Sequence, residues 1–448
     1  MEKFVLRLSP DPKSWLAICS SLMNIMDALI VVPVCAILIV AKIGIRLFSR
    51  PSLLLALTPI LAVGFLTRPA AAQSAGPAGA SGDVFRVFVG GSVSHDSNLF
   101  RLTNFANPKS DTINATGVGL RIDKPYSRQR FQLDVSETAT RYNKFSYLNF
   151  DALNYRGAWL WNLGPRLSGT LSADRSKALA PFEDTLGNQR NVSITKSHAF
   201  NIDGWAFGGW HLLLGVSQSD QKSEQTILNK PDFHSVSSEA GVRYIAPSGN
   251  AITATQRSTR GDYLNQIVAP TVLDNGYKQN ESEIQANWAI TGKSSVTGRL
   301  AWLERKNHNL VQPKFSGEVG NFSYIWTPTE NVSLNVSAAR SIGFLQDPSF
   351  SHIVNDTLSF APTWKVSPKT AVHLSFARTN SAYRGTGLVP ATGPPRRDIE
   401  RRAELGAEWL PMRSLSLNAS LQRQSRSSNN ALVEYGATIT RISASFMF

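Results

Sequence analysis

From residue 84 to the C-terminus, apolar and polar residues alternate along many short segments of the chain. In one of them Val332, Leu334 and Val336 alternate with serine and asparagine. Because successive side chains of a β-strand point to opposite faces, this period of two predicts strands with one apolar and one polar face. The segments run about ten residues, which matches a tilted strand that crosses a membrane.

The connections between these segments alternate between short and long. The short ones lie at 124–128, 163–165, 208–209, 246–250, 291–295, 327–331, 365–369 and 410–413, and the long ones include 221–234, 261–278 and 381–397. Outer-membrane barrels have short periplasmic turns and longer extracellular loops. The sequence therefore predicts an all-β, transmembrane, antiparallel barrel of about 18 strands, with 16 to 18 as the range.

Aromatic residues mark the short connections. Such side chains collect at membrane interfaces, because their rings prefer the headgroup layer. The predicted girdle consists of Trp161, Trp205, Trp210, Tyr244, Trp288, Trp326, Trp364 and Trp409. The last strand ends with apolar residues at every second position and with Phe446 and Phe448, a pattern that resembles the assembly signal of outer-membrane barrels.

The N-terminus reads as an export signal. Basic residues at 46–50, an apolar run at 53–66 and three alanines at 70–72 predict a secretory signal that ends at residue 72. Residues 73–83 are then a periplasmic linker, and 84–448 form the barrel. The first 45 residues leave three alternatives open: a true start near Lys42, a long leader, or a short anchor at 28–41. Both cysteines precede residue 72, so we expect no disulfide in the mature chain.

The composition and the net charge narrow the class of protein. Only 17% of the residues are charged, against about 25% in a typical soluble domain. The formal net charge is +14, and a basic loop at 384–402 is expected to meet lipopolysaccharide or an acidic polymer. Nucleic acid is not an expected partner, since no recognition motif accompanies this loop.

The phase of the alternation assigns polar residues to the inside of the barrel. A wall of both charges with many hydrogen-bonding groups suits hydrated or sugar-like material, and charged rings give such pores their selectivity. The candidates for the lumen are Arg121, Asp134, Arg156, Arg166, Asp203, Glu239, Arg243, Glu283, Arg299, Glu404 and Glu408.

One pair of residues is compatible with enzymatic activity. His95 and Ser97 lie two apart on a predicted strand, where an imidazole can activate a hydroxyl for attack on an ester. This resembles the His-x-Ser-Asn element of outer-membrane phospholipases and lipid A deacylases. No acidic or amide partner for the imidazole is evident, so we expect no enzyme. The histidines show no metal-ligand spacing, and we expect neither a metal nor another cofactor.

The same stretch resembles a second family more closely. Asp96, Ser97, Asn98, Leu99, Phe100 and Arg101 are similar to a motif near the first strand of EpsL-type outer-membrane proteins of exopolysaccharide operons. The resemblance implies export of an exopolysaccharide beside a periplasmic polysaccharide export protein, after folding by the barrel-assembly machinery. Within the motif we expect Asn98 to favour a turn and Arg101 to pair with a carboxylate.

These observations together predict a monomeric channel that exports an exopolysaccharide across the outer membrane of a Gram-negative bacterium. Two alternatives stay open: a general or sugar-specific diffusion porin, and a lipid hydrolase that uses His95 and Ser97.

Overall fold

The computed structural model describes residues 84–182, 188–225, 232–264, 275–308, 315–344, 350, 352–385 and 393–448. The predicted signal peptide and linker lie outside this part of the chain and stay predictions.

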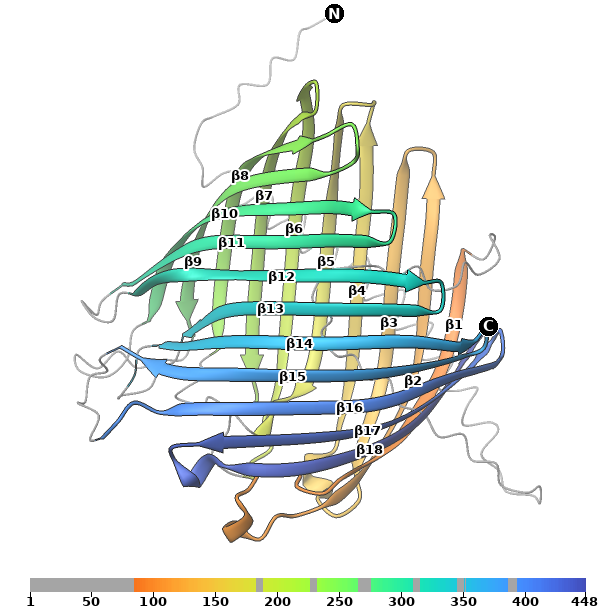
Figure 1. Ribbon diagram of the computed structural model, residues 1–448, viewed down its shortest axis with the longest axis vertical. Coiled ribbons are helices and arrows are strands. Elements are labelled where there is room, and N and C mark those ends of the chain that lie inside the picture. The colour runs from red at the N-terminus through yellow and green to blue at the C-terminus, as the bar shows by residue number, and fades with distance from the viewer. Residues whose placement is uncertain are drawn as a thin grey trace, which may run out of the picture. The chain divides into compact units, whose positions relative to one another are not determined.

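Eighteen β-strands form the described part (Figure 1). Their bounds are β1 Phe85–Asp96, β2 Asp111–Tyr126, β3 Gln129–Tyr142, β4 Phe150–Leu163, β5 Leu167–Leu179, β6 Val192–Phe207, β7 Trp210–Ser223, β8 Phe233–Ile245 and β9 Ala251–Tyr263. The second half comprises β10 Gly276–Thr291, β11 Ser294–Asn307, β12 Phe315–Thr329, β13 Val332–Phe344, β14 His352–Ser367, β15 Thr370–Arg384, β16 Arg397–Met412, β17 Leu415–Ser428 and β18 Tyr435–Met447.

Each strand pairs antiparallel with the next along the chain, and β1 pairs with β18. This last pairing closes the sheet, which leaves no unpaired edge. The prediction of a closed antiparallel barrel of about 18 strands is thereby confirmed. No helix in the described residues is long and apolar enough to cross a membrane.

The connections differ between the two ends of the barrel. At one end the strands of the pairs β2–β3, β4–β5 and β6–β7 follow each other within two or three residues, and the same end holds the start of β1 and the end of β18. The connections at the other end are longer, and in the described residues a short 3-10 helix lies in three of them: η1 Asn104–Ala106, η2 Ser146–Leu148 and η4 Ala431–Val433. All eight predicted short turns lie at the first, periplasmic end.

The strand register sorts the side chains onto two faces, because directly paired residues share a face. Leu300, Phe322 and Leu358 lie on one of them and are 64%, 46% and 57% exposed. The opposite face carries most of the ion pairs described below. Charged groups are costly against lipid, so the apolar face is the outside of the barrel and the polar face lines the lumen.

A small apolar core stands at the extracellular end. Leu99 and Phe100 from the β1–β2 connection pack with Leu148 of η2 and with Phe182, which follows β5. The ring of Phe100 meets those of Phe145 and Phe182 edge to face, with centroids 4.7 and 4.9 Å apart. These contacts fasten three extracellular connections to one another.

Candidate functional site

The lumen face collects the charged residues that the sequence placed there. Ten of the eleven candidates lie on strands and share the inward face, and Arg166 lies one residue before β5. The strand residues are Arg121, Asp134, Arg156, Asp203, Glu239, Arg243, Glu283, Arg299, Glu404 and Glu408.

The densest group of charges spans β8 to β11 and is called the central charge cluster here. It consists of Glu239, Arg257, Glu281, Glu283 and Arg299. Arg257 Nη2 lies 2.8 Å from Glu239 Oε2, and its Nη1 lies 3.4 Å from Glu281 Oε1. Arg299 Nε lies 2.7 Å from Glu283 Oε2, and Arg299 also contacts Glu281. Two guanidinium groups thus hold three carboxylates, which leaves a formal charge of −1.

Burial within the central charge cluster is uneven. The side chains of Glu281 and Glu283 are only 8% and 10% exposed, whereas Arg257 and Arg299 are 35% and 27% exposed. A carboxylate that is removed from water needs a close cation to stay ionised. The arginines therefore face the lumen water and stabilise two carboxylates packed behind them against the wall.

A second group lies near the periplasmic turn between β6 and β7. Asp203 Oδ1 lies 2.6 Å from His211 Nδ1, and Asp203 Oδ2 lies 2.8 Å from Arg243 Nη1. Arg243 Nε also donates to the hydroxyl of Thr253 at 3.3 Å. One carboxylate therefore ties together three neighbouring strands, β6, β7 and β8.

Charge alternates across four further strands. Arg121 on β2, Asp134 on β3, Arg156 on β4 and Asp174 on β5 are direct register partners in that order. Arg121 Nη2 lies 2.7 Å from Asp134 Oδ2, and Arg156 Nε lies 2.6 Å from Asp174 Oδ1. The row presents both signs of charge to the lumen, and its two arginines are more exposed than those of the central charge cluster.

The last two of the predicted lumen residues, Glu404 and Glu408, lie on β16. Glu408 accepts a hydrogen bond from the hydroxyl of Ser416 at 3.2 Å, and Glu404 shares its face. Glu400, further along the same face, lies 3.0 Å from Arg402 and 3.5 Å from Arg426. Charges therefore line the lumen along most of the length of β16.

Two members of the central charge cluster, Arg257 and Glu281, were missed from the sequence. Glu281 is two residues before Glu283, and Arg257 is two residues after Thr255, so the alternation itself placed both on the lumen face. The sequence did not reveal the register of strands β8 to β11, which brings the five side chains of the central charge cluster together.

Seven of the eight predicted girdle residues lie on the outer face near the periplasmic ends of their strands: Trp161, Trp210, Tyr244, Trp288, Trp326, Trp364 and Trp409. Trp161 is buried there and stacks on Phe200 at 6.2 Å.

For Trp205 the prediction is corrected. Trp205 pairs with His211 on the lumen face, and the guanidinium of Arg166 lies 4.7 Å from the centre of its ring. Its position two residues after Asp203 is the signal that assigns it to this face.

Phe446 and Phe448 form an edge-to-face pair, with ring centroids 4.7 Å apart. Phe446 pairs in register with Val89 of β1 and Leu415 of β17, so it lies on the outer face next to the strand pair that closes the barrel.

The motif at 96–101 forms a turn at the end of β1. The side chain of Asn98 accepts from Leu102 N at 2.9 Å and donates to Leu102 O at 2.7 Å. Arg101 adopts a left-handed backbone with φ of 54° and donates to Asp96. Ser97 Oγ accepts from the backbone of Thr438. Each polar residue of the motif therefore has a structural partner.

His95 and Ser97 do not contact each other as a catalytic pair. His95 Nδ1 lies 3.2 Å from Thr112 Oγ1, while Ser97 Oγ accepts a backbone hydrogen bond at 2.8 Å. No group of three or more His, Cys, Asp or Glu residues is placed to hold a metal ion in the described ranges.

Neither a protein-family model nor a curated protein matches the sequence. Solved structures do resemble the fold. The crystal structure of OccK2 (OpdF) from Pseudomonas aeruginosa in complex with glucuronate covers 81% of this chain and 98% of its own, at 9% identity and a TM-score of 0.48. OpdK of the same organism, crystallised with vanillate, has the same coverage and identity and a TM-score of 0.46. Acinetobacter baumannii OccAB3 also covers 81% and 98%, at 8% identity and a TM-score of 0.46.

A closed barrel with an apolar outside, a charged inside and alternating short turns and long loops defines the class. The chain is a β-barrel protein of the outer membrane of a Gram-negative bacterium.

Proposed function

We propose that the protein is a channel for the diffusion of small hydrophilic solutes across the outer membrane. The observation that carries this proposal is the charged lumen face, where the central charge cluster, the Asp203 group and the row from Arg121 to Asp174 follow each other around the wall. Such groups are solvated when water fills the lumen, and they offer hydrogen bonds to polar solutes that pass.

Selectivity in this channel arises from the central charge cluster. Its two guanidiniums lie in front of carboxylates that are nearly buried, so a passing solute meets fixed cations first and a net negative field behind them. This arrangement favours polar solutes that carry both charges or none over strongly anionic ones.

Conductance and solute uptake test the proposal. The protein purified from outer membranes is inserted into planar bilayers, and proteoliposomes are tested for osmotic swelling in neutral sugars and amino acids. We expect steady single-channel conductance at low voltage and swelling that slows as the solute becomes larger. A barrel that is folded and inserted yet neither conducts ions nor admits any of these solutes would contradict the proposal.

Export of an exopolysaccharide is a second candidate, and the motif at 96–101 favours it. Leu99 and Phe100 belong to the apolar core that joins three extracellular connections, where an outgoing polymer would leave the barrel. The polar residues of the motif form hydrogen bonds within the turn itself. The motif therefore supports export less strongly than the charged lumen face supports a diffusion channel.

The two candidates differ in what loss of the gene does. An exporter is needed for surface polymer, so a deletion strain retains polymer in the periplasm and recovers when complemented. A diffusion channel leaves surface polymer unchanged and slows uptake of its solutes.

A further inference from the structure

Three neighbouring strands carry arginines on the outer wall, in their extracellular halves. Arg378 lies on β15, Arg401 on β16 and Arg423 on β17, and all three are exposed. Arg378 pairs in register with outward Leu358 on one side and with Arg401 on the other. Arg423 pairs with Ala403, one step below Arg401 on the same face. The three are called the outer arginine group.

The outer arginine group has no carboxylate partner among the described residues. Arg378 donates to Asn380 Oδ1 at 3.3 Å, Arg401 contacts Ser427 Oγ at 3.5 Å, and Arg423 donates to Thr438 Oγ1 at 2.8 Å. All of these acceptors are neutral. Like charges directly opposite each other destabilise a sheet.

A nearby arginine on the same wall shows the contrast. Arg340 on β13 lies 2.6 Å from Asp356 Oδ1 on β14, and its second nitrogen donates to the other carboxylate oxygen at 3.0 Å. The outer arginine group lacks such a counterion within the described chain, so an anion from outside the protein is needed to relieve the repulsion between Arg378 and Arg401.

The depth of the group matches the outer headgroup layer. From Arg401 to the girdle residue Trp409 the strand runs nine residues, and about 9–11 residues of tilted strand cross one bilayer. Directly below the group, toward the periplasm, the outward residues are apolar: Phe376, Leu405 and Leu421 are 43%, 54% and 50% exposed.

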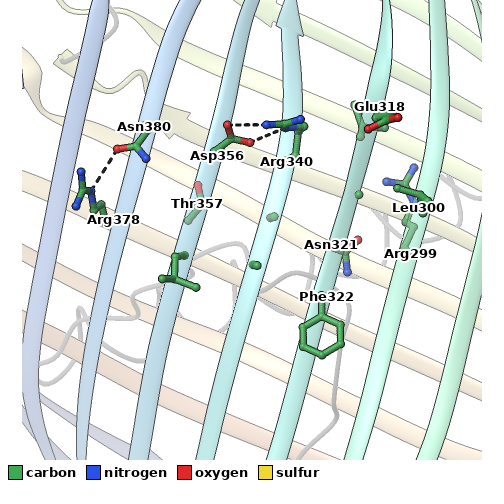
Figure 2. Close-up of a pocket in the computed structure, with 15 residues that line it drawn as sticks. Arg299, Leu300, Glu318, Asn321, Phe322, Arg340, Asp356, Thr357, Arg378 and Asn380 are labelled. Carbon is green, nitrogen blue, oxygen red and sulfur yellow. Dashed lines mark hydrogen bonds and ion pairs between the residues drawn. The ribbon is translucent and has the colours of Figure 1, made fainter.

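An apolar groove runs beside the group on the outer wall, with a volume of about 740 Å³. Small residues, Gly320 and Ala338, lie between the larger Leu300, Phe322 and Leu358. Figure 2 shows Phe322 at one end of the groove, and Arg340, Asp356, Arg378 and Asn380 toward the other. Two carboxylates, Glu318 and Asp356, also line the groove, and Asp356 is paired with Arg340. A largely apolar groove that leads to Arg378 of the outer arginine group suits an acyl chain with an anionic head.

We propose that this surface binds an acylated, phosphorylated glycolipid of the outer leaflet. Arg378, Arg401 and Arg423 contact its phosphate groups, and one acyl chain lies in the groove between Leu300 and Leu358. Guanidinium and phosphate form strong charge-assisted hydrogen bonds, which explains arginine at all three positions. The proposal does not depend on what passes through the lumen.

Binding of diphosphoryl lipid A to the delipidated protein, followed by native mass spectrometry, tests the proposal. We expect the triple variant R378Q/R401Q/R423Q to bind it about tenfold more weakly or worse, because three charge-assisted contacts are lost. The matched control R128Q/K365Q/R413Q removes three exposed cations at the periplasmic turns and should bind as the parent does. The lysine triple R378K/R401K/R423K should retain part of the affinity.

A separate variant tests the proposed acyl-chain groove. Ala338→Trp fills the groove, and we expect weaker lipid binding although all three arginines are present. Ala407→Trp, on the outer face of β16 beyond the residues that line the groove, is its control. Folding of each variant is checked by its heat-dependent gel mobility, and Arg401→Gln alone replaces the triple variant if that does not fold.

Three results would overturn the proposal. Equal binding by the glutamine triple and the parent would remove the role of the arginines. Equal binding of lipid A stripped of its phosphates would remove the role of the phosphate. Competition by inorganic phosphate as strong as that by lipid A would show an anion site without lipid specificity.

Discussion

Arg101 Nη1 donates to both carboxylate oxygens of Asp96, at distances of 3.0 and 2.8 Å. The two residues are five apart, and the turn between them is closed by a backbone hydrogen bond from Arg101 N to Asn98 O at 3.1 Å. Their side chains are only 11% and 7% exposed. A nearly buried ion pair therefore joins the end of β1 to the extracellular connection that follows it.

Loss of this pair should destabilise the barrel. Arg101→Ala leaves the buried Asp96 carboxylate without its cation, and we expect a loss of about 3–5 kcal/mol in the free energy of unfolding. Urea unfolding in lipid vesicles measures it. Arg141→Ala breaks the exposed pair with Asp151 and should cost at most about 1 kcal/mol. Equal losses in the two variants would mean that the Asp96 pair is not desolvated in the membrane-inserted protein.

The assignment of the two faces can be tested on neighbouring strands. Leu300→Arg places a charge against lipid, and we expect a cost of about 2–4 kcal/mol if the site lies near the middle of the bilayer. Asn321→Arg adds the same side chain to the lumen face beside Arg299 and should cost much less. The free energy of unfolding of both variants in lipid vesicles tests this assignment. A larger cost for Asn321→Arg would reverse the assignment.

Removal of cations from the central charge cluster should change ion selectivity. Arg257→Gln together with Arg299→Gln leaves three lumen carboxylates without their guanidiniums, so we expect a shift toward cations. The reversal potential in a salt gradient across a planar bilayer measures this. Arg340→Gln removes a paired arginine from the outer wall and should leave the reversal potential unchanged. An unchanged potential in the double variant would place the selectivity elsewhere.

A close approach between strands makes one glycine sensitive to substitution. A Cβ at Gly169 would collide with the indole of Trp161 and with the carbonyl oxygen of Asn201, whereas a Cβ at Gly298 would meet nothing within 4 Å. We expect Gly169→Ala to cost about 1–3 kcal/mol through overpacking. Gly298→Ala should leave the heat-dependent gel mobility unchanged. Similar midpoint temperatures of the gel-mobility change for Gly169→Ala and Gly298→Ala would show that the barrel wall adjusts around Gly169.

Several features followed from local patterns. The strands, the eight turns and the face of each lumen residue depend on alternation and turn composition, which are properties of neighbouring residues. Trp205 is an exception: its distance from a turn groups it with the other tryptophans, whereas its phase is that of Asp203 and places it on the lumen face.

Other features depend on contacts between strands. Asp203 reaches Arg243 across forty residues of sequence, and Arg257 meets Glu281 from the adjacent strand. Such pairs depend on the register of neighbouring strands, and in a closed barrel each register is coupled to all the others.

The sequence by itself predicted a closed outer-membrane barrel of about 18 strands and placed ten charged strand residues on the lumen face, because alternation and turn chemistry are local. Only the tertiary structure decided which charges meet, that Asp96 and Arg101 are a buried pair, and that Arg378 and Arg401 face each other on the outer wall with no carboxylate partner among the described residues. Those relationships arise from strand register, which side chains far apart in the sequence establish together.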